Sequence, residues 1–148
     1  MKLTPLFLSV ILLLTAVISG CGSSSGIRIE EENQSLGEIK RALIAIMGDP
    51  RKTSQNQREF TSNYFGRKED PKFDPNKVKE RLYAKFIILG DRRPYDIEIT
   101  VFVEEKVGRS YKAIGTDPSV AKSLAKELES RLNQSRDGRN IIDDFRAF

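Results

Sequence analysis

The side chains best placed for chemistry are Glu69, Asp70, Asp74 and Asn76, four oxygen-bearing groups within one short segment. Oxygen ligands of this kind hold hard cations such as Ca²⁺. An EF-hand loop needs ligands at alternating positions, a central glycine and a glutamate at the twelfth position. Counted from Asp70, prolines and lysines interrupt that pattern. We therefore interpret the segment as a solvated acidic loop and expect no metal site.

Two residue types that carry much of enzyme chemistry are almost missing from the 148 residues. There is no histidine, and Cys21 is the only cysteine. Ser-His-Asp and Cys-His catalysis are therefore excluded within the chain, as are zinc sites built from histidine and cysteine. No glycine-rich phosphate loop is present. Carboxylates and lysines remain, but the usual group for proton transfer is absent, and we expect a protein that is not an enzyme and binds no cofactor.

The first twenty residues differ in composition from the rest of the chain. Lys2 is their only charge, and an apolar run begins at Leu6 and reaches Ile18. A basic residue, a short apolar stretch and then small residues are the layout of a secretory signal peptide. The run is short for a membrane-spanning helix, which needs about 20 apolar residues.

The apolar run ends in Ile18, Ser19, Gly20 and Cys21. This segment resembles the lipobox of bacterial lipoproteins, in which an aliphatic residue and two small residues precede a cysteine. The resemblance implies that Cys21 carries lipid and that a signal peptidase, which recognises the three preceding residues, cuts before it. More than one acyl chain anchors a protein stably to a bilayer. The alternative is an uncleaved signal anchor in which Cys21 is an ordinary residue.

The same resemblance predicts where the protein is and how the chain is divided. Gly22 stands where lipoproteins retained in the inner membrane commonly have aspartate, so we expect an outer-membrane anchor with the domain facing the periplasm. Residues 1–20 are then the cleaved signal peptide, and residues 21–26 are the lipidated cysteine with a flexible Ser/Gly tether. Residues 27–148 then form a single α/β domain, and a segment of this length is consistent with one core.

Charges of both signs are interspersed along the mature chain. Without Lys2 it has 24 basic and 21 acidic side chains. This mixture is typical of a soluble surface and not of a face that binds nucleic acid. Basic pairs at 51–52, 67–68 and 92–93 could meet anionic lipid headgroups, although such pairs are more often solvated loop charges.

Two amphipathic helices are predicted. Ser35 and Glu38 have the spacing of a capping box, and the following apolar residues lie on one helical face until Gly48. Asp117 and Pro118 predict the start of a second helix, with an end before Gly138. The expected apolar stripes consist of Leu36, Ile39, Leu43 and Ile46 in the first helix and Ala121, Leu124, Leu128 and Leu132 in the second.

Alternation of apolar and polar residues predicts the strands. Residues 81–89 have apolar even positions and residues 95–105 have apolar odd positions, which indicates a hairpin with one buried face. Two registers fit these faces: one pairs Ile88 with Tyr95, and the other pairs Phe86 with Ile99. Further strands are expected at 27–30, 59–65 and 110–114, while 51–57 and 66–79 are expected to be loops.

These elements predict an α+β two-layer sandwich, with both helices packed on one face of a three- to five-stranded antiparallel sheet. Aromatic residues of the strands are expected to be core, or to form the floor of a ligand groove; they are Phe60, Tyr64, Phe65, Tyr83 and Tyr95. The C-terminal group of Ile141, Ile142, Phe145 and Phe148 either docks on its own domain or binds a partner.

Two functions are expected from these features. The first is a membrane-anchored, non-catalytic accessory module that binds another envelope protein through a sheet edge or the C-terminal group, for example in outer-membrane assembly. The strand-helix-strands-helix order resembles that of the lipopolysaccharide-assembly lipoprotein. The alternative is a periplasmic lipoprotein that binds a lipid or small ligand in a groove between helices and sheet.

Overall fold

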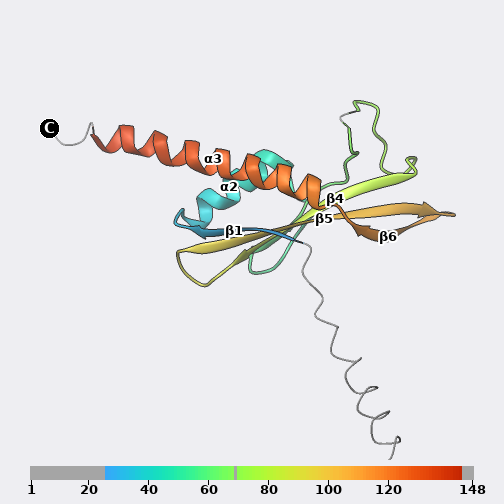
Figure 1. The fold of residues 1–148 in the computed structure, drawn as a ribbon, viewed down its shortest axis with the longest axis horizontal. Helices are drawn as coiled ribbons and strands as arrows, with labels where there is room; N and C mark the ends of the chain where they lie inside the picture. Colours follow the sequence, from blue (N-terminus) through green and yellow to red (C-terminus); the bar gives the residue numbers. More distant parts are fainter. Residues whose placement is uncertain (1–25, 69, 145–148) are drawn as a thin grey trace, which may run out of the picture.

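The computed structural model describes residues 26–68 and 70–144, with side chains described as far as Arg136. Both helices lie on the same face of one antiparallel sheet, which confirms the predicted two-layer α+β sandwich (Figure 1). The sheet has six strands where three to five were expected. The elements follow in the order β1 (Ile27–Glu32), α2 (Leu36–Met47), β2 (Lys52–Thr53), β3 (Glu59–Thr61), β4 (Glu80–Leu89), β5 (Tyr95–Val107), β6 (Ser110–Thr116) and α3 (Pro118–Asp144).

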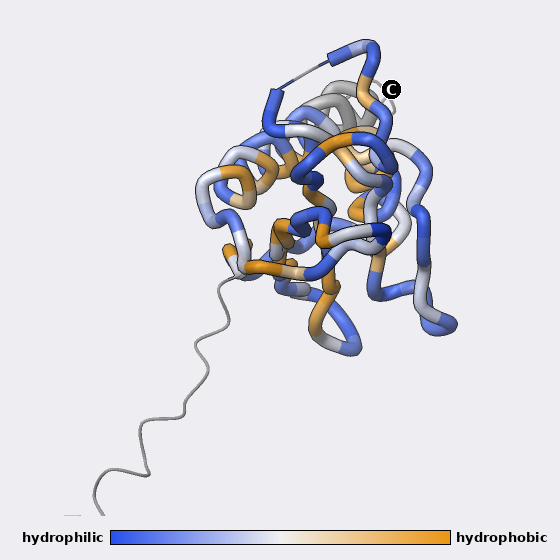
Figure 2. Tube along the Cα trace, turned by 90° about the vertical axis from the view of Figure 1, so that its right-hand side faces the viewer, coloured by the Kyte–Doolittle hydropathy of each residue, from blue (hydrophilic) through white to orange (hydrophobic). Residues whose placement is uncertain are grey.

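The strand order is β1-β5-β4-β3-β2, and β6 also pairs with β5. Strand β5 is long enough to pair with two strands along one side: its first half pairs with β1 and its second half with β6. In Figure 2 hydrophilic residues dominate the peripheral loops, as expected for segments that face solvent.

The β4–β5 hairpin provides the central part of the buried face. Phe86 lies opposite Ile99, and Arg81 lies opposite Glu104. This is the second of the two predicted registers. The even positions of β4 from Leu82 and the odd positions of β5 up to Val103 are buried, as the alternation predicted. The core consists of Ile29, Ile39, Leu43, Phe60, Leu82, Ala84, Phe86, Ile88, Tyr95, Ile97, Ile99, Val101, Val103, Ala121, Ala125, Leu128 and Leu132.

Helix α2 begins and ends as predicted. The Glu38 amide donates to the Ser35 hydroxyl at 3.3 Å, and the Ser35 amide donates to the Glu38 carboxylate at 2.9 Å. This reciprocal pair satisfies two amides that the first turn of a helix otherwise leaves without partners. Gly48 ends the helix with a φ of 70°, a conformation that costs glycine little. Ile39 and Leu43 are buried against the core.

Helix α3 begins at Pro118 as expected, because Asp117 caps it. The Asp117 carboxylate accepts hydrogen bonds from the Ser119 hydroxyl at 2.6 Å and from the Val120 amide at 3.2 Å. These bonds, together with the Arg67 guanidinium, favour the charged form and lower the pKa of the Asp117 carboxyl to about 2. The cap thus stays ionised across the physiological pH range.

The predicted end of α3 before Gly138 is wrong, because the helix continues to Asp144. A single glycine inside a helix costs only about 1 kcal/mol relative to alanine, which neighbouring turns can offset. Among the side chains described, which end at Arg136, the last buried one of α3 is Leu132. Residues 133–144 extend the helix by about 18 Å at its usual rise, beyond the end of the sheet in Figure 1.

Two strand predictions need correction between residues 51 and 65. Residues 51–57 are not entirely a loop, because Lys52 and Thr53 pair with β3. Strand β3 ends at Thr61 instead of Phe65: the Ser62 hydroxyl accepts the Ala84 amide and so replaces a backbone carbonyl of the ladder.

Between Ser62 and Phe65 the chain has one residue more than the part of β4 that it faces. Ser62 bonds to Ala84, but Phe65 pairs with Leu82, so three steps on one side match two on the other. An extra residue of this kind reverses the alternation of side chains. Phe65 therefore turns to the helix face and Tyr64 to the opposite face, whereas unbroken alternation from Phe60 would place Tyr64 on the same face as Phe60.

Candidate functional site

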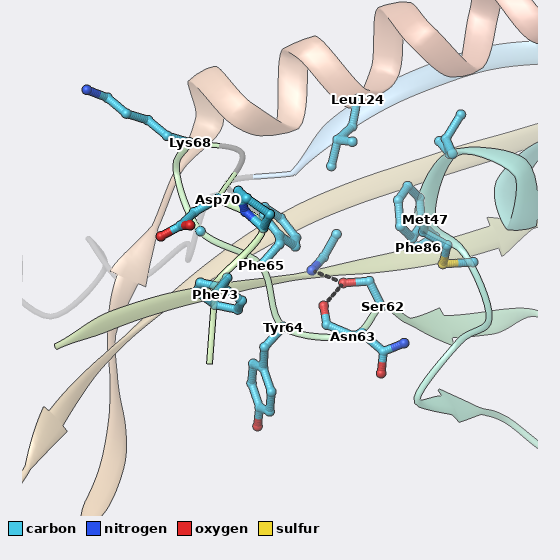
Figure 3. Close-up of a pocket in the computed structure, with 14 residues that line it drawn as sticks. Met47, Ser62, Asn63, Tyr64, Phe65, Lys68, Asp70, Phe73, Phe86 and Leu124 are labelled. Carbon is cyan, nitrogen blue, oxygen red and sulfur yellow. Dashed lines mark hydrogen bonds between the residues drawn. The ribbon is translucent and has the colours of Figure 1, made fainter. Parts of the chain in front are cut away.

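An apolar hollow of about 630 Å³ lies between the helix layer and the sheet (Figure 3). Phe86 and Ala84 of β4 lie at its floor, and α2 and α3 contribute one wall each. The segment from Ser62 to Phe73 closes the third side. Most of the lining is apolar or aromatic: it includes Ile46, Met47, Phe65, Phe73, Ala84, Phe86 and Leu124.

The segment that closes the hollow is held at its base by ion pairs. Arg67 donates from Nε to the Glu80 carboxylate at 2.7 Å and from Nη1 to the Asp117 carboxylate. One guanidinium therefore links the segment to β4 and to the cap of α3. These two hydrogen bonds favour the charged guanidinium and raise the pKa of Arg67.

Glycine at position 66 lets this segment fold back on itself. A Cβ placed there would lie 3.2 Å from the Lys68 carbonyl oxygen and 3.3 Å from the Phe73 ring. The ring of Phe73 instead packs over the bare Gly66 backbone and faces the hollow. Its loop conformation is held by the Phe73 amide, which donates to the Asp70 carbonyl at 3.0 Å.

Polar groups around the hollow are already in use or point away from it. The Ser62 hydroxyl accepts the Ala84 amide and donates to the Asn63 carbonyl at 2.7 Å. Asn63 donates to the Asp49 carbonyl. Lys68 extends away from the hollow into solvent (Figure 3). The site therefore offers contact area without a converging set of donors and acceptors, which favours an apolar group over a polar ligand.

The carboxylates of Asp70 and Asp74 stabilise turns within their own segment. The Asp70 carboxylate accepts the Lys72 amide at 2.8 Å, and Asp74 accepts the Asn76 amide at 2.9 Å. The backbone bond from Asn76 and the bond from Lys77 lower the pKa of Asp74. In residues 26–68 and 70–136, whose side chains are described, no three acidic, histidine or cysteine side chains are grouped to hold a metal ion.

The opposite face of the sheet carries an arginine held between two aromatic rings. The Arg81 guanidinium lies 3.7 Å from the Tyr64 ring centroid and 3.6 Å from that of Tyr111. It also donates to the Glu104 carboxylate at 2.8 Å. Next to it Tyr83 stacks on Phe102 with centroids 5.1 Å apart. Cation–π and ion-pair contacts together make this cluster a clamp that joins the 64–79 segment to β6.

The five aromatics expected as core or groove thus divide into three groups. Phe60 and Tyr95 are core, and Tyr64 and Tyr83 belong to the face without helices. Phe65 faces the hollow. Phe73 was missed by the sequence reasoning. It is the single aromatic of the charged segment 66–79, and an aromatic in such a segment needs somewhere to pack.

Of the remaining predicted site residues, six lie outside the described residues and two have side chains that are not described. Ile18, Ser19, Gly20 and Cys21 precede the first described residue, and Phe145 and Phe148 follow the last. Ile141 and Ile142 belong to α3, but their side chains are not described.

Neither a family model, a curated protein nor a solved structure matches this chain. The site is therefore interpreted from its own geometry. In the part of the chain from residue 26 to residue 144, neither helix has the length and apolar composition needed to cross a membrane.

Proposed function

We propose that this protein is a membrane-tethered, non-catalytic binding module whose hollow holds one apolar chain, such as the acyl chain of a lipid. The observation that carries the proposal is the hollow itself, with its three phenylalanines and aliphatic walls. Of the two functions expected from the sequence, this is the ligand-binding one. A membrane anchor on Cys21 would keep the domain where acyl chains are abundant.

The size of the hollow supports a single chain. Its volume of about 630 Å³ lies within the 300–1,000 Å³ typical of small-ligand sites. A water molecule occupies about 30 Å³ of liquid, so the hollow has the volume of roughly twenty water molecules. One acyl chain fits this estimate, whereas two chains with a headgroup exceed it.

The sheet edges give less support to a partner that adds a strand. Strand β1 has a bulge between Ile29 and Glu32 and a positive φ at Glu31. On β6, Ile114 is an extra residue between two paired positions, and Lys112 is exposed nearby. Strand β2 has only two residues. Bulges, charges and short strands are the features that discourage edge pairing. A protein partner at the C-terminal group stays a prediction.

Leu124 offers a way to fill the hollow. Replacing Leu124, which is half-buried at the wall formed by α3, with tryptophan should weaken binding of dansyl-undecanoic acid by about tenfold or more, because a loss of 1.4 kcal/mol already corresponds to that factor. The measurement is a fluorescence titration of the purified full chain in detergent below its critical micelle concentration.

The matched control is Ile44→Trp, the same kind of enlargement on α2. Ile44 is exposed and does not line the hollow, so this variant should bind the probe as the parent protein does. Equal weakening in both variants, or a parent protein that does not bind the probe, would refute the proposed site.

The tether is tested separately at Cys21. The variant Cys21→Ala should remain as an uncleaved, unlipidated precursor, because the peptidase expected here acts only after lipid attachment. Mass spectrometry of the protein extracted from cell envelopes detects both the cleavage before residue 21 and the attachment of lipid. Normal cleavage and an acylated N-terminus in the variant would contradict the lipobox assignment.

A further inference from the structure

We infer that one end of the sheet, which we call the basic end, docks on an anionic lipid surface. The basic end consists of residues 72–79 and 105–112. Six basic and two acidic side chains give it a net charge of +4, which equals the net charge of the whole chain. The rest of the sequence is therefore neutral on balance. The charged residues are Lys72, Asp74, Lys77, Lys79, Glu105, Lys106, Arg109 and Lys112.

The fold brings these two segments together. The Lys106 amide donates to the Lys79 carbonyl at 2.8 Å, and its ammonium group donates to the Asn76 carbonyl at 2.8 Å. The Tyr111 hydroxyl donates to the Val78 carbonyl at 2.6 Å. The loop that follows the hollow is thus attached to the β5–β6 turn, and cations more than twenty residues apart in sequence become neighbours.

Four of the six cations in the basic end form no ion pair with an acidic side chain of the described residues, and one of the four, Lys106, bonds to the Asn76 carbonyl. Lys77 pairs with Asp74 at 3.2 Å, and Lys79 pairs with Glu105 at 3.5 Å. Lys72, Arg109 and Lys112 are exposed and form no such pair. Their charge remains available to an external anion.

One exposed apolar side chain lies in the basic end, and a second follows two residues after it on β6. Val107 is 48% exposed at the β5–β6 turn, and Ile114 on β6 is 56% exposed. The one other exposed large apolar side chain of the described residues is Ile44, at 41%. Apolar side chains surrounded by lysine and arginine are the combination that enters the interface of an anionic bilayer.

The position of the basic end explains how an acyl chain reaches the hollow. Lys68, Pro71 and Phe73 line the hollow, and residues 72–79 continue from them into the basic end. Docking this end on a bilayer places that wall of the hollow beside the lipid. This step rests on the proposed function, whereas the docking itself does not.

Because the chain contains no tryptophan, one introduced tryptophan is the sole source of tryptophan fluorescence. The full chain with Val107→Trp is reconstituted into vesicles of phosphatidylcholine alone or with phosphatidylglycerol. We expect blue-shifted emission, and quenching by bromine-labelled lipid, only in the anionic vesicles. At 1 M salt, where the screening length is about 3 Å, both signals should disappear. The same chain with Ile44→Trp in place of Val107→Trp should respond in neither.

Charge reversals identify the surface. In the Val107→Trp background, Arg109→Glu with Lys112→Glu should reduce the ratio of docked to undocked protein by about 25-fold or more, since each cation near an anionic surface contributes about fivefold. The matched control is Arg92→Glu with Arg93→Glu, exposed at the opposite end of β5, and it should leave docking unchanged.

Other results would overturn either the inference or the proposed function. Equal emission in neutral and anionic vesicles would exclude electrostatic docking, and loss of docking in the Arg92/Arg93 control would place the contact at the other end of the sheet. Docking without binding of the dansyl probe would leave the basic end intact and remove the proposed function. Probe binding without docking would do the reverse.

Discussion

Truncation of Phe86 to alanine is expected to lower the free energy of unfolding by about 3–5 kcal/mol. Phe86 is fully buried in the middle of β4. It stands in one row across the sheet with Phe60 of β3, Ile99 of β5 and Ile27 of β1. Removing the ring loses its burial and leaves a cavity that this closely paired row cannot collapse to fill. Because the ring also borders the hollow, the result should fall toward the lower end of the range.

Equilibrium urea unfolding followed by circular dichroism measures this loss. The control is Ile87→Ala, the neighbouring position on β4, whose half-buried side chain lies on the face without helices. It should cost clearly less, about 1 kcal/mol, which is typical of a single substitution. If Ile87→Ala were the more damaging of the two, the assignment of the buried face would be reversed.

Replacement of Arg81 by methionine should cost about 3 kcal/mol, the second large effect. The side chains of Arg81 and Glu104 are only 11% and 16% exposed, and they pair at 2.8 Å. Breaking a buried ion pair by removing one partner costs about 3–5 kcal/mol, because the other charge stays buried. Two aromatic contacts and a bond to the Pro75 carbonyl are lost as well.

The double variant Arg81→Met, Glu104→Met separates the two contributions. Replacing both charges with apolar groups removes the buried anion, so it should recover at least about 1 kcal/mol relative to Arg81→Met alone. The exposed pair Lys85–Glu59 on the same face provides the comparison: Lys85→Met should change stability by no more than about 1 kcal/mol. A double variant less stable than the single one would mean that the Glu104 carboxylate stabilises the fold without Arg81.

Local sequence patterns determined most of the secondary structure of this protein. The starts of both helices follow from Ser35 and Asp117, whose side chains bond to amides three residues away or fewer. The buried faces of β4 and β5 follow from alternation. The sequence limited the hairpin to two registers, and the structure has the one that pairs Phe86 with Ile99, which also places Arg81 opposite Glu104.

The candidate site depended on contacts that no local pattern contains. One extra residue between Ser62 and Phe65 moves Tyr64 to one face and Phe65 to the other. Arg67 holds the wall of the hollow through Asp117, fifty positions along the chain. The basic pairs visible in the sequence, at 51–52, 67–68 and 92–93, lie outside the basic end, whose cations come from two separate segments.

The physical reason is the range of the interactions involved. Helix caps and strand alternation act within a few residues, so the sequence by itself determined the helices, the main strands and the core face. A hollow, a buried ion pair and a charged end each require that distant segments approach, which depends on how the whole sheet and both helices pack. Tertiary structure alone therefore decided which aromatic residues face the hollow and which lysines gather in the basic end.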